Sequence, residues 1–312
     1  MGALETVFIT GGTSGVGGSM AEFYAREGFR VVVGYGSDDR AAEKQIELLK
    51  GMSDADHAAI KADITDPNGR AEIFDTLHRM GGISQLVLAA SGGLEKKRKT
   101  DDPFEYARLI NKDAQVAMAE GVQHAWGTSD KMARRIIFLT SHQAWYLKQE
   151  MSDDEGRMQL IAPWDVISAE DNDYGPIAVT KREGVNALTK MQSGADWNLG
   201  LQTTDLIPDS KVARAAAMFY YAEEGDRKLP REERLEVRMQ RLIKARQNQL
   251  ERLGLNTKLY MTAEFAGLAV ARAIDPAWIG VNHLILPDHM NQDTGRRLGG
   301  LDPVATGLVQ VQ

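Results

Sequence analysis

The fold is decided by the stretch Thr10-Gly11-Gly12-Thr13-Ser14-Gly15-Val16-Gly17, near the start of the chain. An apolar run typical of a β-strand, 6–9, comes before this stretch, and a segment with helical spacing, 19–26, comes after it. A strand, a glycine turn and a helix in this order build a phosphate site, because glycines let the backbone approach a pyrophosphate and the helix N-terminus offers free N–H groups. A glycine turn alone is a weak signal, so its place in the chain decides its meaning.

The composition limits the classes of protein to which the chain can belong. The 312 residues, 43% hydrophobic and 26% charged, suit a large α/β domain with insertions and argue against disorder. The formal net charge of −7 argues against nucleic acid as a partner, and the lack of cysteine excludes disulfides and thiolate chemistry. No apolar run approaches the ~18 residues that span a membrane, and no signal peptide precedes the first strand. We therefore expect a cytoplasmic protein with no membrane partner.

Strand-like runs alternate with helical segments along most of the chain. We expect strands at 6–9, 30–35, 58–62, 85–90, 135–140, 200–207 and 281–286, and helices after Gly17, at 41–50, from Asp66 onward, at 106–126 and at 177–192. Repeated β-α-β units predict a Rossmann-like, doubly wound parallel sheet of about seven strands, with the ligand at the carboxyl ends of the strands.

Two segments interrupt this rhythm, and we expect them to form a substrate lid on a single domain that spans residues 1–312. The first, 143–173, is acidic and carries Trp145, Tyr146 and Trp164, whereas the second, 209–255, is largely helical and dense in charge. Long insertions in a compact domain are often functional. The second segment fits an amphipathic helix with a solvated charged face, or a helix whose basic residues meet an anionic carrier or an acidic substrate. Those basic residues are Arg231, Arg234, Arg238, Arg241 and Lys244.

Taken in order, the motifs resemble those of the short-chain dehydrogenase/reductase superfamily, from Val7 to His289 apart from the two insertions. Asp63-Ile64 follows the third strand, where the family holds the adenine ring, and Ala90-Ser91-Gly92 belongs to a turn where the family has Asn-Asn-Ala-Gly. Pro208 closes the sixth strand. The resemblance implies cofactor contacts at Gly11, Thr13, Ser14, Gly15, Val16, Gly17, Asp63, Ile64, Ala90, Ser91, Gly92, Lys181 and Pro208.

The resemblance also implies a set of catalytic residues. Ser141, at the end of the fifth strand, matches the family's serine, Asn111 its proton-relay asparagine, and Lys181 the lysine of its active-site helix. The family's tyrosine stands four residues before the lysine, but that position is Ile177, which has no hydroxyl. Tyr174 lies seven residues before Lys181 and can share its helix face. This Tyr-x6-Lys spacing is similar to that of the enoyl-reductase branch, so we expect an atypical member with Tyr174 as the proton donor.

The end of the second strand indicates the choice of cofactor. An NAD site has an acid at this place, which binds the ribose 2′-hydroxyl. Here the strand ends at Tyr35, and no acid stands at its tip. Ser37, Arg40 and Ser14 suit a 2′-phosphate, whereas Asp38 and Asp39 argue for NAD. We therefore predict that NADP(H) is preferred over NAD(H), with Tyr35, Ser37 and Arg40 at the cofactor.

These residues predict an NADPH-dependent reductase that transfers hydride to a carbonyl of a largely apolar, aromatic or polyketide-like small molecule, free or carrier-bound. One alternative is an enone or enoyl C=C reductase, from the spacing of Tyr174 and Lys181. Another is a catalytically inactive, NADP-binding regulator on the same fold, suggested by Ile177. We expect no metal site. The resemblance implies a homodimer or homotetramer that pairs through the helices at 106–126 and 177–192.

Overall fold

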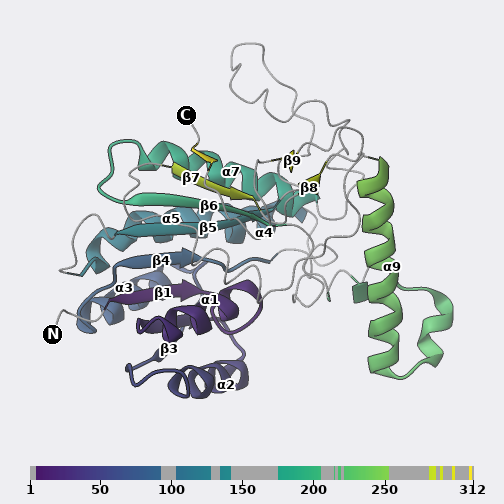
Figure 1. The fold of residues 1–312 in the computed structure, drawn as a ribbon, viewed down its shortest axis with the longest axis horizontal. Helices are drawn as coiled ribbons and strands as arrows, with labels where there is room; N and C mark the ends of the chain where they lie inside the picture. The colour runs from purple at the N-terminus through teal and green to yellow at the C-terminus, as the bar shows by residue number, and fades with distance from the viewer. Residues whose placement is uncertain are drawn as a thin grey trace, which may run out of the picture.

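The computed structural model describes residues 5–92, 103–127, 134–141, 175–204 and 221–252, with short pieces between 214 and 310 (Figure 1). In chain order the strands are β1 (Thr6–Thr10), β2 (Arg30–Tyr35), β3 (Ala58–Lys61), β4 (Gln85–Leu88), β5 (Arg135–Ser141), β6 (Asn198–Thr204), β7 (Val281–Ile285), β8 (His289–Met290), β9 (Arg297–Leu298) and β10 (Val309–Gln310). The α-helices are α1 (Gly15–Arg26), α2 (Asp39–Lys50), α3 (Pro67–Arg79), α4 (Pro103–Arg108), α5 (Ala114–Gly121), α7 (Gly175–Gln192) and α9 (Arg231–Arg252).

The main sheet has the strand order β10-β7-β6-β5-β4-β1-β2-β3. All pairs from β7 to β3 are parallel, and β10 joins the edge antiparallel to β7. The predicted doubly wound parallel sheet is therefore confirmed, with β10 as an added edge strand. Because β1 lies between β2 and β4, the strand order reverses at β1, and open α/β sheets bind ligands at the carboxyl ends of the strands at such a point.

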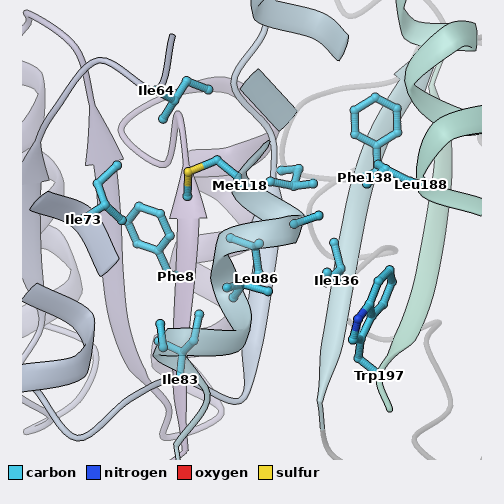
Figure 2. Packing of buried hydrophobic residues seen from close by; sticks show 14 of the residues in the cluster. Phe8, Ile64, Ile73, Ile83, Leu86, Met118, Ile136, Phe138, Leu188 and Trp197 are labelled. Carbon is cyan, nitrogen blue, oxygen red and sulfur yellow. The ribbon is translucent and has the colours of Figure 1, made fainter. Parts of the chain in front are cut away.

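Side chains that alternate along the strands form a core on each face of the sheet. On one face, Val7 and Ile9 of β1 pack with α1 and with Leu49 of α2. On the other face, Phe8 packs with α3, α5 and α7, which contribute residues such as Met118 and Leu188 (Figure 2). A strand that is buried on both faces reads as a continuous apolar run, which explains why β1, β4 and β5 were evident in the sequence.

The helix expected at 106–126 is wrong as one continuous helix. The structure has α4, then a π-helical turn at Leu109–Asp113, then α5, and last a 3₁₀ turn at Val122–Ala125. The π turn coincides with Asn111, whose side-chain Nδ2 donates to the carbonyl of Ala107 at 2.9 Å. A widened turn leaves backbone carbonyls without their usual helical donors, so the amide side chain replaces one of those donors.

Several other boundaries differ from the expected ones by a few residues: for example, α2 begins at Asp39 rather than at residue 41, and β4 ends at Leu88 rather than at residue 90. β6 begins at Asn198 rather than at residue 200, because the Asn198 N–H donates to the carbonyl of Arg134 and the register with β5 starts at Arg135–Asn198. Helix α7 begins at Gly175 rather than at residue 177. The expected continuation of β6 to residue 207 lies outside the described residues.

His57 extends the pairing of β2 beyond the short strand β3. The register of the two strands starts at Val32–Ala58, and the N–H of Val31 instead donates to Nδ1 of His57 at 3.1 Å. Nε2 of His57 lies 2.9 Å from Oγ of Ser53, and the ring is buried. An Nδ1 that accepts a hydrogen bond must be unprotonated, and burial lowers the pKa of His57.

We expect the stability that His57 contributes to disappear in acid. Its folded-state pKa is lowered, so its contribution is complete above the ordinary value of about 6.5 and is lost as the pH falls through the folded-state pKa. The effect should be about 1 kcal/mol, the net value of one hydrogen bond. Urea unfolding of the wild type and of His57→Gln between pH 8 and pH 5 measures it. A stability difference between the two proteins that does not change with pH would contradict the prediction, and His78→Gln, at an exposed histidine, is the control.

A buried ion cluster holds α9 against the 3₁₀ turn that precedes it, Glu224–Lys228. Asp226 is 2% exposed and accepts hydrogen bonds from Nε of Arg238 at 2.8 Å and from both terminal nitrogens of Arg241. The bonds from Arg241, and that from the Glu223 N–H, lower the pKa of Asp226. In Figure 1, α9 lies on the side of the sheet toward which the strands run.

Among the helices that the structure describes, none is both long enough and apolar enough to cross a bilayer.

Candidate functional site

The site is built where β1, β4 and β5 end. Thr10, the last residue of β1, ties the first two of these strand ends together. Its Oγ1 donates to the carbonyl of Val87 at 3.2 Å and accepts from the N–H groups of Ala89 and Ala90 at 3.0 and 3.1 Å. The turn after β4 is thus fixed beside the glycine turn, and the two predicted cofactor segments lie together.

The glycine turn fits closely against its neighbours. A Cβ at Gly17 would lie 2.6 Å from the carbonyl oxygen of Gly11, and one at Gly12 would lie 2.8 Å from the side chain of Val33. Gly11 and Gly15 have positive φ, which L-residues rarely adopt. Larger residues at these positions would therefore deform the turn.

The start of α1 leaves its backbone N–H groups available to an anion. Ser14, at the N-cap, makes no side-chain capping hydrogen bond, and the first turn carries no acidic residue. Within the described part of the chain, nothing lies within 4 Å of where a Cβ of Gly15 would stand. Thr13 and Val16 are half-buried in the same turn. An uncapped helix N-terminus behind an open glycine turn suits a pyrophosphate.

Asn111 connects the turn after β4 to the helix behind it. It is 1% exposed; its Oδ1 accepts from Oγ of Ser91 at 3.0 Å, and its Nδ2 donates to the carbonyl of Gly92 at 2.9 Å. Gln115, one turn later, donates to the carbonyl of Ala90 at 2.8 Å. Gln115 was not among the predicted site residues, although an amide four residues after Asn111 was a usable signal.

Lys181 is buried at the end of β5. Its Nζ donates to the carbonyl of Leu139 at 2.8 Å and lies 5.7 Å from the centre of the Phe138 ring. The side chain is 5% exposed, and burial lowers the pKa of Lys181 to about 8. Ser141 lies two residues beyond Leu139 on the same strand and is also buried. The structure therefore brings Lys181 close to the end of the strand that carries Ser141.

Helix α7 passes close to the π turn. A Cβ at Gly184 would lie 3.0 Å from the carbonyl oxygen of Asn111 and from the Phe138 ring, so glycine permits this approach. On the same helix, Ile177 is 1% exposed, which leaves the family's tyrosine position filled by a hydrocarbon side chain. The expected donor, Tyr174, lies outside the described residues, as do Pro208 and the insertion at 143–173.

The ends of β2 and β3 carry the other predicted cofactor residues. Ser37 and Arg40 are exposed, and the hydroxyl of Tyr35 donates to Asp39. Lys61, which the sequence analysis missed, also donates to Asp39.

Asp63 and Ile64 lie just beyond β3. Asp63 is exposed, and its Oδ1 accepts from the N–H and the hydroxyl of Thr65. Ile64 is buried, and its carbonyl accepts from Arg70 at 2.7 Å. These contacts fix the segment that was expected to hold the adenine ring.

The five basic residues predicted on α9 do not form one free surface. Arg238 and Arg241 bind Asp226, and Arg234 donates to the carbonyl of Leu229. An anionic partner could therefore meet only Arg231 and Lys244 of this set as exposed side chains. The five residues therefore do not act as one set, because the buried carboxylate of Asp226 binds Arg238 and Arg241.

Comparisons with known proteins show what the chain is similar to. Residues 5–152 match the family model described as short chain dehydrogenase. Versicolorin reductase 1 of Aspergillus parasiticus is 28% identical over 144 residues, which are 45% of this chain and 52% of that protein. A trihydroxynaphthalene reductase of Pestalotiopsis fici is 28% identical over 124 residues, 38% of this chain and 44% of that protein. The chain thus spans about half the length of the curated relatives that it matches.

Solved structures share the fold over most of the chain. An actinorhodin polyketide ketoreductase variant with NADPH has a TM-score of 0.63 at 15% identity and covers 91% of this chain and 95% of its own. An alcohol dehydrogenase from Thermococcus sibiricus, complexed with 5-hydroxy-NADP, has a TM-score of 0.59 at 14% identity and covers 91% and 96%. At these identities the likeness establishes the fold alone.

Proposed function

Because the chain is a member of the short-chain dehydrogenase/reductase superfamily, we propose that it is an NADPH-dependent reductase of a carbonyl on a largely apolar, aromatic or polyketide-like small molecule. The observation that carries this proposal is Lys181, a buried ammonium held on the carbonyl of Leu139 at the end of β5. Burying a cation costs free energy because the charge loses its water. Lysines with a strongly shifted pKa are typical of catalytic sites.

The described residues fit a dinucleotide. The N–H groups at the start of α1 would hold the pyrophosphate, the loop after β2 the adenosine 2′-phosphate, and Asp63 with Ile64 the adenine ring. The turn at Ala90–Gly92, fixed by Asn111 and Gln115, would lie along the cofactor toward Lys181. When bound, the dihydronicotinamide supplies the hydride.

The chain's own residues then manage the charge that develops on the substrate oxygen. We assign Ser141 as a hydrogen-bond donor to that oxygen and Tyr174 as the proton donor. The ammonium of Lys181 lowers the pKa of a nearby phenol from its ordinary value of about 10. Asn111 would continue the proton path through water from Lys181. Donors placed before the reaction stabilise a developing oxyanion better than water does.

Reduction of a conjugated C=C bond is the second candidate. Ile177 favours this reaction, because a buried hydrophobic residue stands at the usual tyrosine position. The nearest tyrosine that precedes Lys181 is then Tyr174, at a distance of seven residues. In such a reaction Tyr174 would stabilise an enolate rather than an alkoxide.

The neighbours' printed names guide the choice of substrates. Versicolorin reductase, trihydroxynaphthalene reductase and polyketide ketoreductase are named for aromatic or polyketide chemistry. We extend that chemical class to this chain, with residues 143–173 and 209–255 as its substrate lid. We also propose a homodimer or homotetramer that pairs through α4, α5 and α7.

The test is the oxidation of NADPH, followed by absorbance, with a panel of polycyclic aromatic ketones, simple ketones and enones. We expect turnover of aromatic ketones with NADPH and at least about tenfold weaker kcat/KM with NADH. Equal turnover with both cofactors would contradict the NADPH preference. Turnover of enones alone would favour the C=C reductase. Tight NADPH binding without turnover of any member would favour the inactive regulator.

A further inference from the structure

A row of backbone hydrogen bonds joins the glycine turn to the ends of β2 and β3. The N–H of Gly12 donates to the carbonyl of Gly34 at 3.3 Å, and the N–H of Ala62 donates to the carbonyl of Tyr35 at 3.0 Å. A dinucleotide whose pyrophosphate lies on α1 therefore brings its adenosine ribose to the end of β2. The groups around Tyr35 are the ones that would meet position 2′ of that ribose.

Tyr35, Asp39 and Lys61 form a hydrogen-bonded cluster at this place. The hydroxyl of Tyr35 donates to Oδ1 of Asp39 at 3.0 Å, and Nζ of Lys61 donates to Oδ2 at 2.8 Å. Tyr35 and Lys61 are paired in the register of β2 and β3, and Asp39 is the first residue of α2. Both oxygens of the carboxylate thus have a donor from the protein.

In this cluster Asp39 stays ionised, and the positive charge of Lys61 balances its negative charge. The hydrogen bonds from Lys61 and then from Tyr35 lower the pKa of Asp39, and the bond to Asp39 raises the pKa of Lys61. A free carboxylate at this place would accept the ribose 2′-hydroxyl of NADH and would repel the 2′-phosphate of NADPH. A carboxylate already bound to an ammonium does neither well.

We propose that Lys61 determines the cofactor preference of this chain, by withdrawing Asp39 from the ribose 2′-hydroxyl and by adding a positive charge beside the 2′-phosphate. This inference rests on the proposed dinucleotide site. Exposed Arg40, next to Asp39 on α2, adds a second cation, whereas Asp38 is engaged in capping α2 at the N–H of Ala41. Lys61 lies on β3, whereas the cofactor preference was predicted from the residues at the end of β2.

Calorimetric binding of two adenosine probes tests this role without any turnover. The probes are adenosine 2′,5′-bisphosphate, which carries the 2′-phosphate, and 5′-AMP, which carries the 2′-hydroxyl. We expect the wild type to bind the bisphosphate more tightly. Lys61→Met should weaken bisphosphate binding about tenfold, the effect of removing one charge next to a dianion in water, and should strengthen AMP binding.

Asp39→Asn should strengthen bisphosphate binding by about fivefold, because the repelling charge is gone and Lys61 is freed.

Matched variants control for net charge and for folding. Lys190→Met and Asp75→Asn make the same charge changes at exposed positions on α7 and α3, and should leave both affinities unchanged. The side chains of Lys61 and Asp39 are 53% and 56% exposed, so we expect their variants to unfold within a few degrees of the wild type.

The outcomes separate this inference from the function on which it rests. If the wild type prefers the bisphosphate and Lys61→Met keeps that preference, the role of Lys61 is overturned while the dinucleotide site stands. If the wild type binds neither probe, the dinucleotide site and the role of Lys61 are both overturned. A tenfold loss in Lys61→Met that Lys190→Met does not share supports the proposal.

Discussion

Lys181→Met should lower kcat by about a thousandfold, close to 4 kcal/mol of transition-state stabilisation. The change removes the buried ammonium that, in the proposed mechanism, acidifies the proton donor and holds the nicotinamide ribose. It should not unfold the protein, because methionine is of similar length and leaves no buried charge that must be desolvated. Steady-state kinetics and thermal unfolding of the same preparation measure both effects. Lys190→Met, on the exposed side of the same helix, should keep full activity.

The pH profile gives an independent check on Lys181. A lysine is charged below its pKa, and burial lowers that pKa to about 8 in the free protein. We therefore expect kcat/KM of the wild type to fall as the pH rises above about 8, since this parameter reports the groups of the free enzyme. A thousandfold loss in Lys181→Met that came with a large fall in unfolding temperature would contradict a catalytic role and indicate a structural one.

Tyr174→Phe should lower kcat by about a hundredfold or more and leave the Kd for NADPH unchanged, because general acid catalysis typically contributes that much and phenylalanine removes only the hydroxyl. Single-turnover kinetics and fluorescence titration with NADPH measure the two quantities. Tyr146→Phe is the matched control, since Tyr146 carries the other phenolic hydroxyl in the sequence between β5 and α7. Full activity of Tyr174→Phe together with a large loss in Tyr146→Phe would move the donor to Tyr146.

The sheet could be predicted from the sequence because its strands are buried on both faces. Phe8, Leu86 and Ile136 lie in runs with few polar residues. A segment with helical spacing comes after each run, so the order of strands and helices could be predicted from the pattern of apolar residues. The π turn could not be predicted in this way. Apolar spacing reports an average of 3.6 residues per turn, and one widened turn around Asn111 changes it too little to be noticed.

The candidate site was predictable where a residue stands at a strand end or in a known motif. Asn111 and Lys181 were found in this way, and the structure gives both a buried, hydrogen-bonded position. Lys61 was missed because its partner is distant in sequence, whereas Gln115 was missed although it stands four residues after Asn111. Lys61 meets Asp39 only because β2 and β3 are neighbours in the sheet, and an exposed lysine is otherwise unremarkable.

The widened turn at Leu109–Asp113 has a consequence for comparing this chain with others. A π turn holds about one residue more than an α turn, so the spacing of residues along the sequence shifts by one residue across it. The widened turn absorbs that residue, and α4 keeps the orientation in which Arg108 meets Glu183 of α7 at 3.1 Å. Relatives that lack the wide turn should therefore align with this chain only through a one-residue gap at this place. The gap would show which of them lack the widened turn around Asn111.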